Sequence, residues 1–282
     1  MSVVNFQFGR PLSSYEEQTE TIGSAKGVPI FGLDALGSAA YGPEAAFTLL
    51  IPLGMAGVHY IVPISLSIIG LLVIVCFPYL QTTPAYPMGG GSYTVASQNL
   101  GANMGLLAAD ALMIDYVLVV GISAGIGALI SALPSLETYT LPFCLATLVI
   151  VTLVNLRGVS ETGAAFLFPT YIFVGCLWAM ILIGLWKMVA AGGHPTPVIA
   201  LPALKGISET GSVAAVENFL QWLHGHDRVE AVSNGVQTFR EPRAKNAQVT
   251  LVTIIAILIV MLAGIAVLCQ AIPYWRDGAW ER

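Results

Sequence analysis

Long apolar runs constrain this chain more than any other feature of its sequence. The clearest covers residues 59–82 and begins HYIVPISLSIIGLLVIVCFPYL. About 20 such residues in a helix span the hydrocarbon core of a bilayer. Hydrophobic residues make up 56% of the chain and charged residues only 10%, against about 25% charged residues in soluble domains. The sequence therefore predicts an all-α integral membrane protein.

By the same length criterion we expect seven spans, at residues 28–54, 59–82, 104–133, 140–156, 163–190, 214–238 and 248–272. Together they form a transmembrane domain over residues 28–272. A polar segment, residues 1–27, precedes it, and a tail, residues 273–282, follows it. Lys and Arg favour the cytoplasmic side of short loops, and their distribution favours a cytoplasmic N-terminus.

The first apolar run, residues 28–54, carries two acids, Asp34 and Glu44, together with helix-breaking residues. Asp34 lies inside it, and a charge at membrane depth costs about 2.5–3.5 kcal/mol on insertion scales. Gly37, Gly42 and Pro43 follow, and broken helix is tolerated there only where it lines a cavity. Both features favour the interrupted half-helix of a transporter. The alternative is a proline-kinked structural span.

Polar side chains recur at helical spacing after Asp34. Tyr41 is seven positions further on, with Ser38 between them, so all three lie on one helical face. Unwinding at Gly37 and Gly42 would add free carbonyls to this face. An oxygen-rich site of this kind suits a desolvated cation or an ammonium group, whereas exposed amides of the next half-helix suit a carboxylate.

The third predicted span carries a second polar stripe. Asp115, Tyr116 and Ser123 recur at seven or eight positions and so share a helical face. Asp110 lies nearer the start of this span, where it is expected to reach water. Intramembrane carboxylates are functional by default, and Asp115 is therefore a candidate ligand.

A run of glycines, Gly89-Gly90-Gly91, precedes Ser92 between the second and third spans. It lacks the Lys of a phosphate-binding loop, and no strand precedes it. A close-packed bend is the preferred interpretation. Two GxxxG spacings, at Gly101–Gly105 and Gly121–Gly125, are typical of close helix contacts.

Several function classes find no support in the residues. No basic stripe with aromatic residues favours nucleic-acid binding. His224 and His226, in HGHD, point to different helical faces and have no further ligand nearby, so no metal site is predicted. No nucleophile is arranged with a base and an acid, and we expect neither catalytic residues nor a cofactor, only a transported cation and a proton as ligands.

Five ordered motifs resemble the amino acid–polyamine–organocation (APC) superfamily of permeases, most of all the branch with bacterial proton-coupled potassium importers. They are FGLDALGSAAYGPEA, YPMGGGSYTVASQNLG, ALMIDYVLVVGISAG, NLRGVSETG and VEAVSNGVQTFREPRAKNAQVTL. The resemblance implies a LeuT-like fold of inverted repeats with discontinuous first and sixth helices. It also implies that Asp34, Tyr41, Asp115, Tyr116 and Ser123 form a potassium site, and that Glu230 is the acid of the sixth span.

The chain departs from this superfamily in two places. Members continue beyond the seventh span, so the chain is expected to be truncated, with the first repeat and the start of the second. Residues 219–228 read FLQWLHGHDR, where the superfamily has small residues resembling FSSGCTALTG. A frameshift in the gene is a hypothesis for both departures, and an unbroken reading frame in the nucleotide sequence would exclude it.

The leading functional prediction is a secondary active transporter of the plasma membrane. Its substrate is a small cation such as potassium, or an amino acid, and coupling to protons is implied by the resemblance. The expected partners are the lipid bilayer, the substrate and, through the GxxxG faces, a second copy in a homodimer. The alternative is a remnant that does not transport and acts only as a membrane interaction protein.

Overall fold

A computed structural model describes residues 21–50, 55–117, 126, 129–130, 132–156, 159–192 and 230–271. Within these ranges, side chains are not described at residues 41–42, 44–50, 55–59, 114–117, 159–160 and 270–271. Regular structure in the described part is helical, apart from one isolated β-bridge that joins Ile22 to Phe239. The predicted all-α class agrees with this structure.

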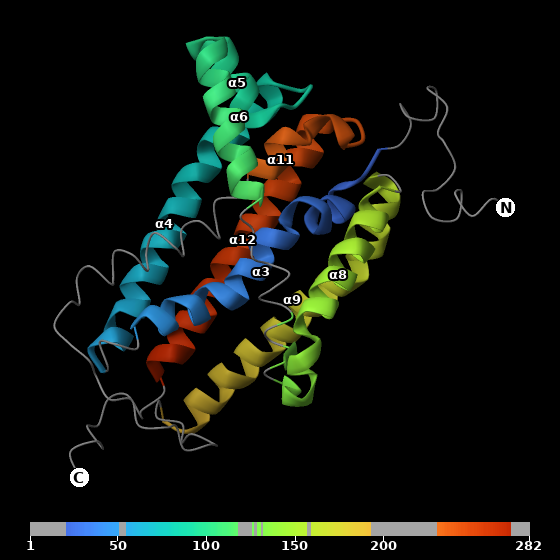
Figure 1. Ribbon diagram of the computed structural model, residues 1–282. Helices are drawn as coiled ribbons and strands as arrows, with labels where there is room; N and C mark the ends of the chain where they lie inside the picture. The colour runs from blue at the N-terminus through green and yellow to red at the C-terminus, as the bar shows by residue number, and fades with distance from the viewer. Residues whose placement is uncertain are drawn as a thin grey trace. The chain divides into compact units, whose positions relative to one another are not determined.

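The helices, in chain order, are α3 (Ser24–Leu50), α4 (Met55–Ala85), α5 (Gly91–Leu100), α6 (Ala102–Val117), the 3-10 helix η2 (Pro134–Tyr139), α8 (Thr140–Asn155), α9 (Val159–Ala190), α11 (Ala231–Asn234), the 3-10 helix η4 (Val236–Thr238) and α12 (Arg243–Ala271) (Figure 1). Their lengths vary widely. Four of them exceed 26 residues, whereas α11 has four.

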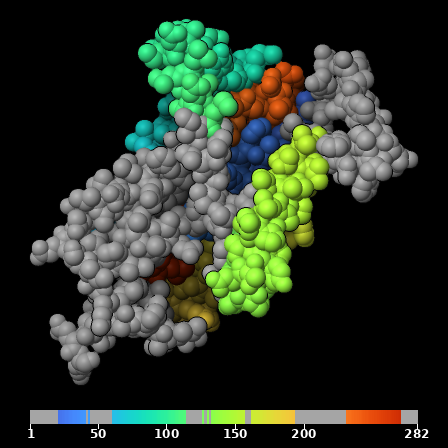
Figure 2. Space-filling model, viewed as in Figure 1, coloured from blue at the N-terminus to red at the C-terminus, as the bar shows by residue number. Residues whose placement is uncertain are grey.

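Four helical stretches are long and apolar enough to cross a membrane, and they coincide with the second, fourth, fifth and seventh predicted spans. They are Tyr60–Ala85, Pro134–Asn155, Glu161–Ala190 and Arg243–Cys269. The stretch that contains α8 has none of its apolar window buried inside the protein, and α8 lies open on the face seen in Figure 2. An apolar helix without protein cover is what contact with lipid requires.

The first predicted span is a helix, but it is not interrupted. Helix α3 runs continuously through Gly37, Gly42 and Pro43, so the break predicted there is wrong for this structure. An internal proline removes one hydrogen bond and bends the helix, and each glycine costs about 1 kcal/mol. Complete unwinding would leave several backbone groups without partners, each at several kcal/mol in apolar surroundings. One lost bond is the smaller cost.

The glycine-rich region after α4 forms a turn and a helical hairpin. Gly101, with φ +96°, joins α5 to α6 and has no atom within 4 Å of the position of an added Cβ. A Cβ on Gly105 would lie 2.7 Å from Cβ of Ser97 on α5. The predicted close contact is therefore confirmed for Gly105 and is wrong for Gly101, which is a turn residue. Gly121 and Gly125 lie outside the described residues.

The end of the sixth predicted span, residues 214–238, also differs from the expectation of a membrane helix. Only its last residues are described, and they form α11 and η4. Gly235 ends α11, and Phe239 has extended backbone with φ −80° and ψ 150°. That extended residue is needed for the bridge to Ile22. Residues 230–238 thus form two short helices and not the end of one regular membrane helix, so the predicted span end is corrected.

The chain divides into two compact units. The first contains Met1–Leu33, Tyr79–Thr170 and Glu230–Leu251, and the second contains Asp34–Pro78, Tyr171–Val229 and Val252–Arg282. Long helices such as α4 and α12 contribute residues to both units. The site described below lies within the first unit.

Close packing inside the second unit comes from glycines on facing helices. A Cβ added to Gly184 of α9 would lie 2.8 Å from Leu268 of α12, and one added to Gly264 of α12 would lie 2.6 Å from Ile181 of α9. Small residues allow helices in membranes to approach closely, as these two do.

Candidate functional site

Glu230 is the buried acid of the first unit. It directly precedes α11, and only 9% of its surface is exposed. Burying a carboxylate is unfavourable unless hydrogen bonds replace the water that it loses. Ser92 donates such a bond from Oγ to Oε2 at 2.6 Å, and Tyr79 donates another from its hydroxyl to Oε2 at 3.2 Å. The short Ser92 bond has the length of a hydrogen bond to a charged oxygen.

The two donors come from distant parts of the sequence. Tyr79 lies near the end of α4, 151 positions before Glu230, and Ser92 lies in the first turn of α5, 138 positions before it. No local turn can bring such residues together, so the site exists only in the folded first unit. Within the residues that the structure describes, neither Lys nor Arg forms an ion pair with Glu230.

Three consecutive glycines hold the start of α5 against α11. Gly89, Gly90 and Gly91 have φ values of +74°, +100° and +43°, a region that other residues adopt only with strain. The amide of Gly90 donates to the carbonyl oxygen of Asn234 at 3.3 Å. A Cβ on Gly89 would collide with this oxygen, and one on Gly91 would collide with the Asn234 side chain. The predicted close-packed bend is confirmed.

The other side of α11 packs on the start of α3. A Cβ on Gly235 would collide with the ring of Phe31, and this ring lies 5.4 Å from that of Phe239. Phe239 itself is fully buried, as is Ile22. An aromatic contact of this kind adds about 0.5–1.5 kcal/mol beyond the buried area. The segment after Glu230 is therefore fixed from both sides within the first unit.

A short parallel pairing joins the residues before α3 to those after η4. The amide of Ile22 donates to the carbonyl of Thr238 at 2.9 Å, and the amide of Arg240 donates to the carbonyl of Ile22 at 2.9 Å. The Arg240 side chain adds a bond from Nε to the Thr21 carbonyl at 3.3 Å. These bonds satisfy backbone groups that a helix end leaves unpaired.

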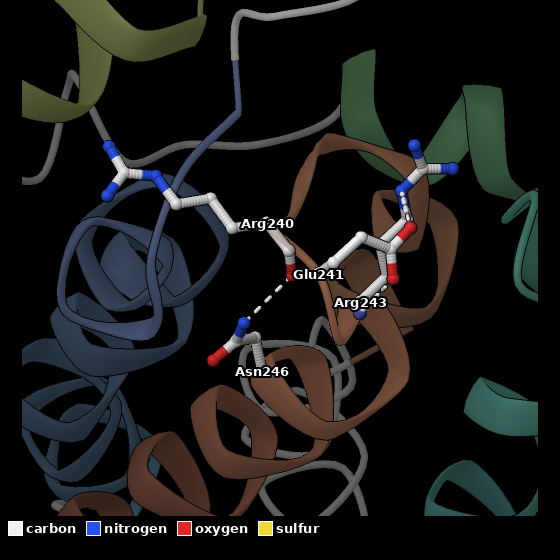
Figure 3. A network of polar contacts seen from close by, with 4 residues as sticks. All are labelled: Arg240, Glu241, Arg243 and Asn246. Carbon is white, nitrogen blue, oxygen red and sulfur yellow. Dashed lines mark hydrogen bonds and ion pairs between the residues drawn. The ribbon is translucent and has the colours of Figure 1, made fainter.

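The turn from this pairing into α12 is stabilised by its own polar contacts, shown in Figure 3. Asn246 donates from Nδ2 to the carbonyl of Arg240 at 2.8 Å. Glu241 accepts the backbone amide of Arg243 at 3.3 Å, and its Oε1 lies 3.2 Å from Nε of Arg243. Glu241 thus accepts the first amide of α12, one of the amides that a helix leaves without a partner in its own backbone. The Glu241 side chain is 77% exposed, so the ion pair adds little.

The predicted residues Asp34 and Ser38 lie one turn apart on α3. Ser38 is fully buried, and its hydroxyl donates to the backbone carbonyl of Asp34 at 3.0 Å. This is a common arrangement for serine inside a helix. The Asp34 side chain is partly exposed. Whether either residue binds a ligand stays a prediction.

The remaining predicted ligands cannot be compared with Glu230. Tyr41, Asp115 and Tyr116 belong to α3 and α6, but their side chains are outside the described ones. Ser123 lies outside the described residues altogether. The potassium site that the resemblance implies for Asp34 and Asp115 is therefore still a prediction. Asp110 is exposed, as expected of a residue that reaches water.

Sequence reasoning missed the two hydroxyl donors. Tyr79 was treated as one apolar residue of a span, and Ser92 as part of a bend. A signal was present, because Ser92 directly follows a run of glycines that opens a helix, where backbones approach closely. Among the described residues, no group of three or more His, Cys, Asp or Glu side chains could hold a metal ion.

A buried carboxylate held by hydroxyls, in a chain with several membrane-crossing helices, defines a multi-pass membrane protein with an acidic polar site. The sequence profile of the amino acid permease family matches residues 33–273. The chain therefore belongs to this family of membrane transporters, which is not a family of enzymes and which implies a LeuT-like fold.

One relative is the potassium transporter KimA of Bacillus subtilis (strain 168). It is 34% identical to this chain over 273 residues, which is 95% of this chain and 44% of the relative. The chain thus spans less than half of the length of this relative. The resemblance to the APC superfamily that the sequence motifs predicted is confirmed.

Proposed function

We propose that this chain is the transport module of a secondary active transporter that moves a small cation such as potassium, coupled to protons. The observation that carries the proposal is Glu230, a buried acid whose partners in the described first unit are the neutral hydroxyls of Tyr79 and Ser92. Neutral donors stabilise a carboxylate without cancelling its charge. Such a group can take up either a proton or a cation.

The sequence stripes supply the rest of the proposed site. Asp34, Ser38 and Tyr41 on α3, with Asp115, Tyr116 and Ser123, would give carboxylate and hydroxyl oxygens. Oxygen ligands suit a bare alkali cation. The name of the relative, a potassium transporter, favours the same choice of substrate.

An amino acid is the second candidate substrate, favoured by the description of the family as amino acid permeases. An amino acid would need backbone amides for its carboxylate. The continuous course of α3 offers fewer free amides than a broken helix would. It offers fewer free carbonyls for a cation as well, so the preference for the cation rests on the carboxylate and hydroxyl oxygens of the two stripes and on the name of the relative.

The proposal includes placement in the plasma membrane with a cytoplasmic N-terminus. Under this arrangement Lys26 and the basic residues of the α12 start, Arg240, Arg243 and Lys245, face the cytoplasm. Positive charges are enriched in cytoplasmic loops.

Uptake of rubidium, a tracer for potassium, into proteoliposomes made with the full chain tests the proposal. Glu230→Gln removes the charge and keeps the shape, and we expect uptake to fall at least tenfold. Glu137→Gln is the matched control, because Glu137 is exposed on η2. Equal uptake by Glu230→Gln and the unaltered chain would contradict the role of Glu230. Competition by an excess of amino acids, but not of potassium, would favour the second substrate.

The alternative, a membrane interaction protein that does not transport, rests on the observation that the chain spans 44% of the relative's length. Size-exclusion chromatography of the purified chain, followed by a rubidium-binding measurement, distinguishes a transporter from an interaction protein. A uniform particle that binds rubidium supports transport, and its mass shows whether the chain is a monomer or a homodimer. A heterogeneous aggregate without rubidium binding supports the alternative.

A further inference from the structure

Both hydrogen bonds to Glu230 end on the same oxygen. Ser92 reaches Oε2 at 2.6 Å and Tyr79 reaches it at 3.2 Å. A hydroxyl has one hydrogen to donate, so a proton placed on Oε2 would force at least one of these hydroxyls to turn its own hydrogen away. Neither bond occupies Oε1. The geometry therefore makes the two carboxylate oxygens unequal.

Contacts that do not involve Glu230 fix the backbone around the first donor. The carbonyl of Tyr79 accepts the Thr83 hydroxyl at 2.7 Å, and Thr83 is 1% exposed. The next carbonyl, that of Leu80, accepts Nε2 of Gln248 from α12 at 2.8 Å. Tyr79 is thus held by its own helix and by α12.

The second donor is fixed by the glycine run. Gly90 donates to the carbonyl of Asn234, and the spaces beside Gly89 and Gly91 are filled by the same asparagine. Asn234 lies one helical turn after Glu230, and Ser92 directly follows Gly91. The start of α5 therefore touches the Glu230 segment at two points, one through backbone and one through the carboxylate.

We propose that Ser92 and Tyr79 are positioning residues, which hold Oε2 of Glu230 and leave Oε1 as the oxygen that exchanges a proton or a cation. This inference rests on the proposed function, in which Glu230 takes part in transport. Neither hydroxyl itself touches the transported ion. Their effect is to fix which oxygen is presented and in which direction.

Rubidium uptake by Ser92→Ala and Tyr79→Phe in the full chain tests the first consequence. We expect the KM of Ser92→Ala to rise about tenfold, because a hydrogen bond to a charged group is lost. Tyr79→Phe should raise it about threefold, because its bond is longer. Ser92→Thr keeps a hydroxyl and should restore KM to within about twofold. Ser67→Ala is the control, since Ser67 is exposed and bonds only to the Pro63 carbonyl of its own helix.

The same substitutions are then made in Glu230→Gln, as a double-mutant cycle. Positioning acts through the carboxylate, so Ser92→Ala should add no further loss once the charge is absent. If Ser92→Ala weakens rubidium uptake by the same factor in Glu230→Gln as in the unaltered chain, Ser92 acts on the stability of the fold and not through the carboxylate. That result would overturn the inference.

A second measurement does not depend on transport. Carbodiimides react with protonated carboxyl groups, so labelling of Glu230 by dicyclohexylcarbodiimide, read by mass spectrometry, reports how well the carboxylate is held. Hydrogen bonds to the charged form favour that form. Ser92→Ala should therefore label about three- to tenfold faster than the unaltered chain, and Ser92→Thr at nearly the same rate.

The two measurements separate failure of this inference from failure of the proposed function. Faster labelling of Ser92→Ala in a chain without any rubidium uptake would reject transport and support positioning. Uptake that is lost in Glu230→Gln but unchanged in Ser92→Ala and Tyr79→Phe, with unchanged labelling, would support transport and reject positioning.

Discussion

Glu230 and Asp34 are both acids in apolar parts of the chain, but their surroundings differ in kind. Glu230 stands at a change of backbone direction, before the four-residue helix α11, and hydroxyls from α4 and α5 reach it. Asp34 stands inside the 27-residue helix α3, where the Ser38 hydroxyl turns back to the Asp34 carbonyl. Hydroxyls from distant parts of the sequence donate to the carboxylate of Glu230, whereas the backbone carbonyl of Asp34 accepts a hydroxyl from its own helix.

This comparison shows that the length of the helix around an acid affects which residues come close to it. A long helix satisfies its own amides and carbonyls and needs few contacts from elsewhere. A short helix leaves most of its backbone groups unpaired, so other segments must come close to satisfy them. The segment around Glu230 obtains hydrogen-bond partners in this way from Ile22 and Gly90. Substitutions there should be more damaging than comparable ones in α3.

The largest effect is expected at Phe239, the fully buried aromatic residue of this irregular segment. Phe239→Ala should lower the free energy of unfolding by about 3–5 kcal/mol, because it empties a packed site beside Phe31. Thermal unfolding in detergent measures it. Phe168→Ala is the control, since Phe168 is 71% exposed in the same unit. Similar losses for both would remove the distinction between the two regions.

Gly89→Ala comes next. Its φ is +74° and its Cβ would collide with the Asn234 carbonyl, so we expect a loss of about 2–4 kcal/mol from strain and displacement of α11. Gly101→Ala separates the two causes, because Gly101 has φ +96° but open space around it. Gly101→Ala should lower the free energy of unfolding by only about 1–2 kcal/mol. Thermal unfolding in detergent measures both variants. Equal unfolding midpoints for Gly89→Ala and Gly101→Ala would show that the contact with Asn234 does not contribute to stability.

Pro43→Ala tests the regular side of the comparison. If α3 is continuous, alanine restores a missing amide and should stabilise the chain by up to about 3 kcal/mol. The measurement is again the unfolding midpoint in detergent. Destabilisation by this substitution would indicate that α3 is interrupted at Pro43 after all, and would restore the broken-helix prediction.

The smallest effect is expected for Ser38→Ala, a loss below about 1 kcal/mol in the free energy of unfolding, because the hydroxyl donates to the Asp34 carbonyl, which the helix already uses. Rubidium uptake is the sharper measurement here. A lower affinity without a change in unfolding midpoint would support Ser38 as a ligand. Unchanged affinity and stability would leave it a structural residue of α3.

Most of the regular structure could be predicted because membrane spans depend on local composition. The second, fourth, fifth and seventh spans follow from apolar length alone. The continuity of α3 could not be predicted, since glycine and proline weaken a helix without deciding whether it bends or breaks. The end of α11 at Gly235 was missed because this glycine packs on Phe31, which is far away in the sequence.

The candidate site was predictable only in part, for the same reason. Glu230 was identified through the resemblance of VEAVSNG to a family motif. Its partners Tyr79 and Ser92 are separated from it by 151 and 138 positions, and no spacing rule connects residues at such distances. The glycine run before Ser92 indicated a close approach but not which residue was approached.

The pairing of Ile22 with Phe239 also sets an order for biosynthesis. Thr21 and Arg240, which flank it, are 219 positions apart, so at 5–20 residues per second a ribosome needs about 11–44 s between them. Throughout that time Ile22 has been synthesised but the residues that pair with it have not. A chain that ends before Phe239 would therefore leave the start of α3 without this pairing.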